Sequence, residues 1–133
     1  MGVVLAVEIP EEVVTAIAPF PSDPSSVTDA RHFVASSLEA GGCPPATIET
    51  AKLLVSELAS NAVVHAPGPF QVSLSQQEHS LTIAVTDSSS RRPSPRSVSA
   101  TGGRGLHLVE ALANDWGVCD RDGGKAVYFC LPC

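Results

Sequence analysis

The sequence predicts an α+β fold: a two-layer α/β sandwich with helices on one face of a mixed, mostly antiparallel sheet. Two segments with helical periodicity come first, between residues 24 and 41 and between residues 45 and 67. Segments in which apolar and polar residues alternate follow at 70–75 and 81–86, and a second pair of strand-like segments closes the chain. Helices that precede antiparallel hairpins indicate packing on one face of the sheet, and no doubly wound parallel sheet is implied.

The N-terminal part of the chain contains one clear helix. An Asp-Pro-Ser-Ser sequence at residues 23–26 marks its start, apolar residues follow at helical spacing, and the two glycines at 41–42 end it. Ahead of it, residues 3–7 predict a short strand or an apolar arm, and residues 10–24 form a lead-in punctuated by prolines.

The central helix carries polar residues beside its apolar face. Proline at its start and the Pro-Gly-Pro sequence after it define its ends. Glu57, Asn61 and His65 are spaced four residues apart, so they stack along one side of the helix. An amide oxygen can ligate Mg²⁺ and a carboxylate can deprotonate an attacking hydroxyl, although such a pair is also common on a solvated helix face. The buried side is predicted from apolar residues three and four apart: Ala51, Leu54, Val55, Leu58, Ala62 and Val63.

The remaining elements follow in order: a hairpin at 70–75 and 81–86, a helix at 105–112, and strands at 116–119 and 126–131 joined by a turn at 121–124. Between them, residues 88–104 lose all periodicity and consist mainly of serine, proline, arginine and glycine. A loop of this length inside a compact domain indicates a lid or a binding element.

Composition indicates a single globular domain over residues 1–133, with residues 1–19 as an N-terminal arm or strand. The chain is 44% hydrophobic and 17% charged, and it contains no apolar run long enough to span a membrane. Its start lacks the features of a signal peptide, so we expect a cytoplasmic protein. A net charge of −6 disfavours binding to nucleic acid or to anionic membranes.

The four cysteines are scattered, which predicts reduced thiols rather than a disulfide framework. Cys130 and Cys133 form a CxxC sequence at the end of the chain, without the second pair that a zinc site needs. A thiol or metal-binding function through these two residues is therefore a remote alternative.

Two further segments contain candidate binding residues. Asp87 ends a predicted strand and precedes Ser89 in a serine-rich stretch, where a carboxylate could accept a hydrogen bond from an exocyclic amine or could simply cap the turn. Residues 101–106, Thr-Gly-Gly-Arg-Gly-Leu, lie directly before a helix, where glycines let the backbone approach a phosphate and the helix supplies free N–H groups. A glycine hinge is the alternative for this segment.

Charge favours a polyphosphate ligand. Residues 88–104 contain no Asp or Glu, but they hold four of the eight Lys and Arg residues: Arg91, Arg92, Arg96 and Arg104. Guanidinium groups pair with phosphate oxygens in a fork geometry. An acidic partner surface is the alternative explanation.

In this order and spacing, the three segments resemble the GHKL, or Bergerat-fold, ATP-binding superfamily. They resemble most the stand-alone anti-sigma factor serine/threonine kinases of bacteria, in particular the actinobacterial branch. ELASNAVVHA at 57–66 is similar to their N-box, TDSSS at 86–90 to their adenine-binding box, and GGRGLHLVEALANDWGV at 102–118 to their second glycine box with the following helix and strand.

The resemblance implies ATP and Mg²⁺ as cofactors. It implies that Asn61 ligates Mg²⁺, Glu57 is the general base, and Asp87 binds the adenine amino group. Residues 88–104 would form an ATP lid. The remaining nucleotide contacts that the family pattern implies are His65, Ser89, Gly102, Gly103, Arg104, Gly105 and Leu106.

The family also implies a partner switch that controls transcription. Such a domain holds a sigma factor inactive and phosphorylates a serine or threonine of an antagonist protein, the anti-anti-sigma factor, and it commonly forms a homodimer. The main alternative is a non-catalytic module that binds ATP and sequesters a sigma factor or another regulator. Glu57 favours the kinase, whereas Thr101, where characterised kinases tend to carry arginine, favours the module.

Overall fold

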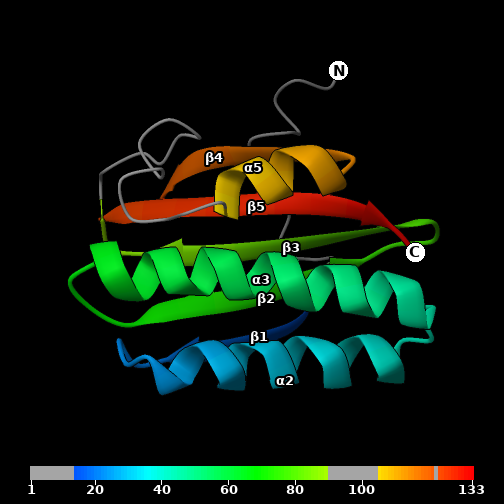
Figure 1. The fold of residues 1–133 in the computed structure, drawn as a ribbon, viewed down its shortest axis with the longest axis horizontal. Coiled ribbons are helices and arrows are strands. Elements are labelled where there is room, and N and C mark those ends of the chain that lie inside the picture. The colour runs from blue at the N-terminus through cyan, green and yellow to red at the C-terminus, as the bar shows by residue number, and fades with distance from the viewer. Residues whose placement is uncertain (1–13, 90–104, 122) are drawn as a thin grey trace.

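The computed structural model describes residues 14–89, 105–121 and 123–133. The elements in chain order are β1 (Val14–Phe20), α2 (Ser25–Ala40), α3 (Pro45–His65), β2 (Phe70–Gln76), β3 (Ser80–Asp87), α5 (Gly105–Leu112), β4 (Asp115–Arg121) and β5 (Gly124–Pro132). Figure 1 shows the described helices side by side over one face of the sheet. The predicted two-layer α+β architecture is thus confirmed.

The two long helices begin and end where their local sequence dictates. The Asp23 carboxylate accepts a hydrogen bond from the Ser25 backbone N–H at 2.9 Å, and Gly41 follows the last turn of α2. Helix α3 has proline at its start, where the missing N–H costs nothing, and Pro67 follows its end. Ala30, Val34 and Leu38 of α2 are fully buried, as are their counterparts on α3, so apolar packing holds this pair together.

The sheet has the strand order β1-β2-β3-β5-β4, and all pairings between described strands are antiparallel. Strand β5 therefore lies between β3 and β4, although β4 precedes it in the sequence. Every second side chain of the central strands points toward the helices, and these side chains form the main core. They include Val72, Ile83, Val85 and Phe129. The C-terminal end of β3 and the N-terminal end of β5 consequently lie at the same edge of the helix-covered face.

Strand β1 differs from the sequence-based expectation. Residues 10–24 were expected to be a proline-punctuated lead-in, but Val14–Phe20 pair with β2 along the edge of the sheet. Pro19 lacks an N–H donor, and an edge strand tolerates this because only one of its sides is paired. The strand or arm expected at residues 3–7 lies outside the described residues.

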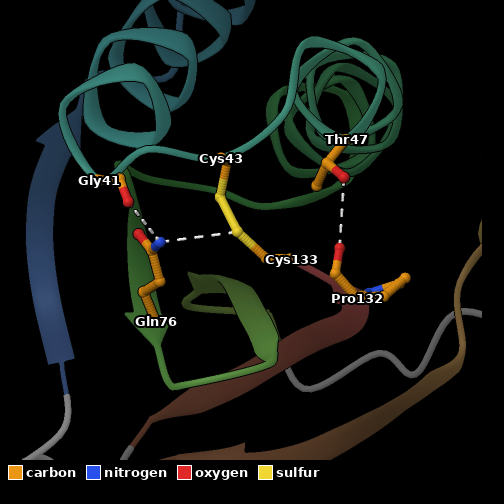
Figure 2. The surroundings of a disulfide bond; sticks show 6 residues. All are labelled: Gly41, Cys43, Thr47, Gln76, Pro132 and Cys133. Carbon is orange, nitrogen blue, oxygen red and sulfur yellow. Dashed lines mark hydrogen bonds between the residues drawn. A yellow bond between two sulfur atoms is a disulfide. The ribbon is translucent and has the colours of Figure 1, made fainter.

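The cysteines correct a second expectation. Cys43, in the turn between α2 and α3, forms a disulfide with Cys133 at the end of β5, with 5.6 Å between the two Cα atoms (Figure 2). The expectation of four reduced thiols is wrong because the fold brings this turn beside the end of the last strand. The Gln76 side-chain amide donates a hydrogen bond to the Gly41 carbonyl at 3.0 Å and closes the same corner.

The other two cysteines, Cys119 and Cys130, are free thiols. Burial raises the pKa of the Cys130 thiol, which lies 3.3 Å from the Thr82 hydroxyl. Because Cys133 is bonded to Cys43, it is not available as a thiol partner for Cys130. The CxxC sequence is therefore not a dithiol unit in this structure.

Candidate functional site

One end of the molecule brings three elements together. Figure 1 shows the C-terminal end of α3, the C-terminal end of β3 and the start of β5 on the left, opposite the chain terminus marked C. Helix α3 contacts both strands, and a Cβ built on Gly68, just after α3, would lie 3.6 Å from the Ser88 hydroxyl. The predicted N-box helix and the predicted adenine-binding box are thus neighbours in space.

The polar residues of α3 lie at the boundary of the core. Glu57 and Asn61 are half-buried and His65 is exposed, whereas Leu58 and Ala62 are buried. The carboxylate of Glu57 and the amide of Asn61 therefore stand one turn apart on a helix that is fixed by packing on its other side. Such a pair can supply an oxygen ligand for a hard cation and a base beside it.

Asp87 is buried and forms an ion pair with Lys125 of β5. The lysine ammonium donates to both carboxylate oxygens, at 2.8 Å to Oδ1 and 3.0 Å to Oδ2, and the backbone N–H of Ser89 donates to Oδ1 at 2.9 Å. Only 7% of the Lys125 side chain and 6% of the Asp87 side chain are exposed. Each charge is therefore compensated by the other, as burial of a charged group requires.

This ion pair depends on the close approach of β3 and β5. Asp87 and Lys125 are direct partners in the antiparallel register, and their side chains point to the helix-covered face with Val85 and Val127. A Cβ built on Gly124 would overlap the carbonyl oxygen of Asp87 and would lie 2.8 Å from the Ser88 Cα. Glycine at this position therefore allows the two backbones to meet.

We expect Gly124→Ala to lower the free energy of unfolding by about 1–3 kcal/mol, the usual cost of overpacking a closed site. Urea unfolding followed by circular dichroism measures the change. Gly68→Ala is the matched control, because its Cβ would make only an ordinary contact with Ser88, and it should change stability much less. Equal stabilities of the two variants would contradict the close approach of the strands.

The glycine segment is described only in part. Gly102, Gly103 and Arg104 lie outside the described residues, as do Arg91, Arg92 and Arg96 of the predicted lid. Gly105 begins α5 and Leu106 follows in its first turn. Helix α5, which begins at the end of the glycine segment, packs against α3, the predicted N-box helix.

Sequence reasoning missed Lys125 and Gly124. Lys125 lies between the predicted turn at 121–124 and the predicted strand at 126–131, so it was assigned to neither. It is a charged residue directly before a run of apolar residues. A charged side chain at the start of a buried strand requires a partner, and this requirement was the available signal. The identity of the partner follows only from the pairing of β5 with β3.

No helix in the described part of the chain has both the length and the apolar character needed to cross a membrane. Across the same residues, no group of three or more His, Cys, Asp or Glu side chains is arranged to hold a metal ion. A hard cation held by only one or two protein oxygens would not require such a group.

Comparison with known proteins places this fold in a family. A family model described as histidine kinase-like ATPase domain matches residues 20–131. In structure, the chain is similar to a chain in the crystal structure of the SiaB–SiaC complex from Pseudomonas aeruginosa, with a TM-score of 0.64 and 12% sequence identity over 91% of each chain. No curated protein matches the sequence significantly.

The family match covers the described helices and strands except residues 14–19 of β1 and Pro132 of β5, and it includes the three segments that carry the resemblance to the GHKL superfamily. The chain therefore belongs to the family of histidine kinase-like ATPase domains.

Proposed function

We propose that this chain binds Mg-ATP at the end formed by α3, β3 and β5, and transfers the γ-phosphoryl group to a serine or threonine of an antagonist protein. The observation that carries the proposal is the buried Asp87 carboxylate, which retains an acceptor direction and lies beside the N-box helix. A buried acceptor discriminates strongly between ligands, because a ligand without a matching hydrogen-bond donor leaves the acceptor unpaired.

The described residues fit this ligand. Asn61 is half-exposed with its amide available, so it would ligate Mg²⁺, while Glu57 one turn earlier would accept the proton of the attacking hydroxyl. Asp87 would accept a hydrogen bond from the adenine amino group. Bound Mg²⁺ would neutralise charge on the phosphates, and ATP would supply the phosphoryl group. His65, Ser89 and the segment from Gly102 to Leu106 would complete the nucleotide contacts.

The similarity to a chain from the SiaB–SiaC complex, an assembly of two proteins, supports a protein partner for this domain. Together with the resemblance to anti-sigma factor kinases, it supports a role in a partner switch. In that switch, a sigma factor and its anti-anti-sigma antagonist compete for a homodimer of this chain. Phosphorylation of the antagonist would release it and leave the sigma factor bound.

Isothermal titration calorimetry of Asn61→Ala tests the site. We expect ATP affinity in excess Mg²⁺ to fall at least about 10-fold, because the loss of a ligand weakens metal binding at least as much as the loss of its outer-shell support. The difference from wild type should shrink when Mg²⁺ is removed with EDTA. Ser60→Ala, the preceding and also half-buried residue, is the matched control and should bind like wild type. Equal affinities of Asn61→Ala and wild type would show that α3 carries no metal ligand.

A further inference from the structure

The Asp87–Lys125 pair presents a donor and an acceptor side by side. An ionised carboxylate offers about four acceptor directions, and three are used by Lys125 Nζ, which bonds both oxygens, and by the Ser89 N–H on Oδ1. The remaining direction is on Oδ2. Both Asp87 oxygens lie on one side of the ammonium, which carries three protons, so at least one proton remains for a ligand.

We propose that Lys125 is a second base-reading residue of this site: its ammonium donates to ring nitrogen N1 of adenine while Asp87 Oδ2 accepts from the neighbouring exocyclic amine. The inference rests on the proposed function, because it concerns the same nucleotide. Adenine presents an amino donor next to a ring-nitrogen acceptor, which is the complement of the pair. Hypoxanthine and guanine present a carbonyl oxygen and an N1–H there, which opposes both contacts.

Burial makes this pair selective. The two side chains lie on the helix-covered face of the sheet and are almost completely removed from water, so hydrogen bonds formed there are not weakened by competing solvent. The pair is neutral as a unit. A neutral purine can therefore approach it without leaving a buried charge uncompensated, whereas a lone lysine or a lone aspartate here would be costly.

A structural role is the alternative for Lys125, in which it only neutralises Asp87. The two roles differ in one measurable quantity, the preference for ATP over 1-deaza-ATP, which lacks only the N1 acceptor. A residue that merely compensates charge does not affect this ratio, whereas a residue that bonds N1 does. The comparison in the wild-type protein needs no substitution and is independent of any folding defect.

The test is calorimetric titration of wild type and variants with ATP, 1-deaza-ATP and 7-deaza-ATP in excess Mg²⁺. Wild type should bind 1-deaza-ATP about 10- to 100-fold more weakly than ATP, the effect of one lost hydrogen bond to a charged group, and 7-deaza-ATP like ATP. Lys125→Met should bind ATP and 1-deaza-ATP equally. If this variant does not fold because Asp87 is left unpaired, the double variant Asp87→Asn/Lys125→Met removes the buried charge and keeps a carbonyl acceptor, and it should also bind both nucleotides equally.

Failures of the two proposals are distinguishable. Absence of ATP binding by wild type would overturn the proposed function and this inference with it. Equal binding of ATP and 1-deaza-ATP by wild type, or a preference that survives in Lys125→Met or the double variant, would leave the ATP site in place and overturn the role of Lys125. A loss confined to 7-deaza-ATP would likewise overturn the assignment to N1.

Discussion

Replacing Glu57 with glutamine should lower the rate of phosphoryl transfer by about 100-fold or more, the lower range expected for removal of a general base. Glutamine has the same shape as glutamate, so the packing of this half-buried position on α3 is preserved. It cannot accept the proton of the attacking hydroxyl at neutral pH. ATP affinity should therefore remain close to that of wild type, because Asn61 and Asp87 are unchanged. Single-turnover transfer from labelled ATP to the antagonist protein measures the rate.

Glu49→Gln provides a matched control for this experiment. Glu49 lies on the same helix but is exposed near its N-terminal end, where it forms a surface ion pair with Lys52 at 3.2 Å. A surface pair of this kind contributes little, so the variant should transfer phosphate at the wild-type rate. Unchanged transfer by Glu57→Gln would assign Glu57 to structure. Retained ATP binding without transfer by wild type to any antagonist would favour the non-catalytic module.

The parts of the fold that are encoded locally could be predicted from the sequence. Helices α2 and α3 and the β2–β3 hairpin follow from periodicity and from proline and glycine at their ends, because these signals act over one or two turns. Strand β1 was missed because prolines flank and enter it, and only its position at the sheet edge makes Pro19 acceptable. The placement of β5 between β3 and β4 is a long-range property without a local signal.

The candidate site likewise contains residues with a local sequence signal and residues whose role depends on long-range pairing. Glu57, Asn61 and His65 were predicted because their spacing of four residues is a local helical pattern, and Asp87 because it ends a strand. Lys125 bonds a carboxylate 38 residues away, and the contact exists only because β5 lies between β4 and β3 and pairs with β3. The disulfide was missed for the same reason, since its cysteines are 90 residues apart in the sequence.

Reduction of the Cys43–Cys133 disulfide should lower the free energy of unfolding by about 2–4 kcal/mol. The bond closes a loop of 90 residues, which spans most of the chain, so it removes a large share of the conformational freedom of the unfolded state. Urea unfolding with and without dithiothreitol measures the difference. Thiol titration of the unfolded protein should give two reactive thiols, Cys119 and Cys130, before reduction and four after it.

Serine variants separate this effect from other actions of the reductant. Cys43→Ser/Cys133→Ser should have the stability of the reduced wild type, both with and without dithiothreitol. Cys119→Ser/Cys130→Ser should still lose stability when dithiothreitol is added, as wild type does. Four reactive thiols in the unreduced protein would show that the bond does not form.

The disulfide joins the start of α3 to the end of β5, while Asp87 pairs with Lys125 near the start of β5, at the opposite end of that strand. Reduction should therefore change stability and leave ATP affinity unchanged at temperatures where both forms are folded.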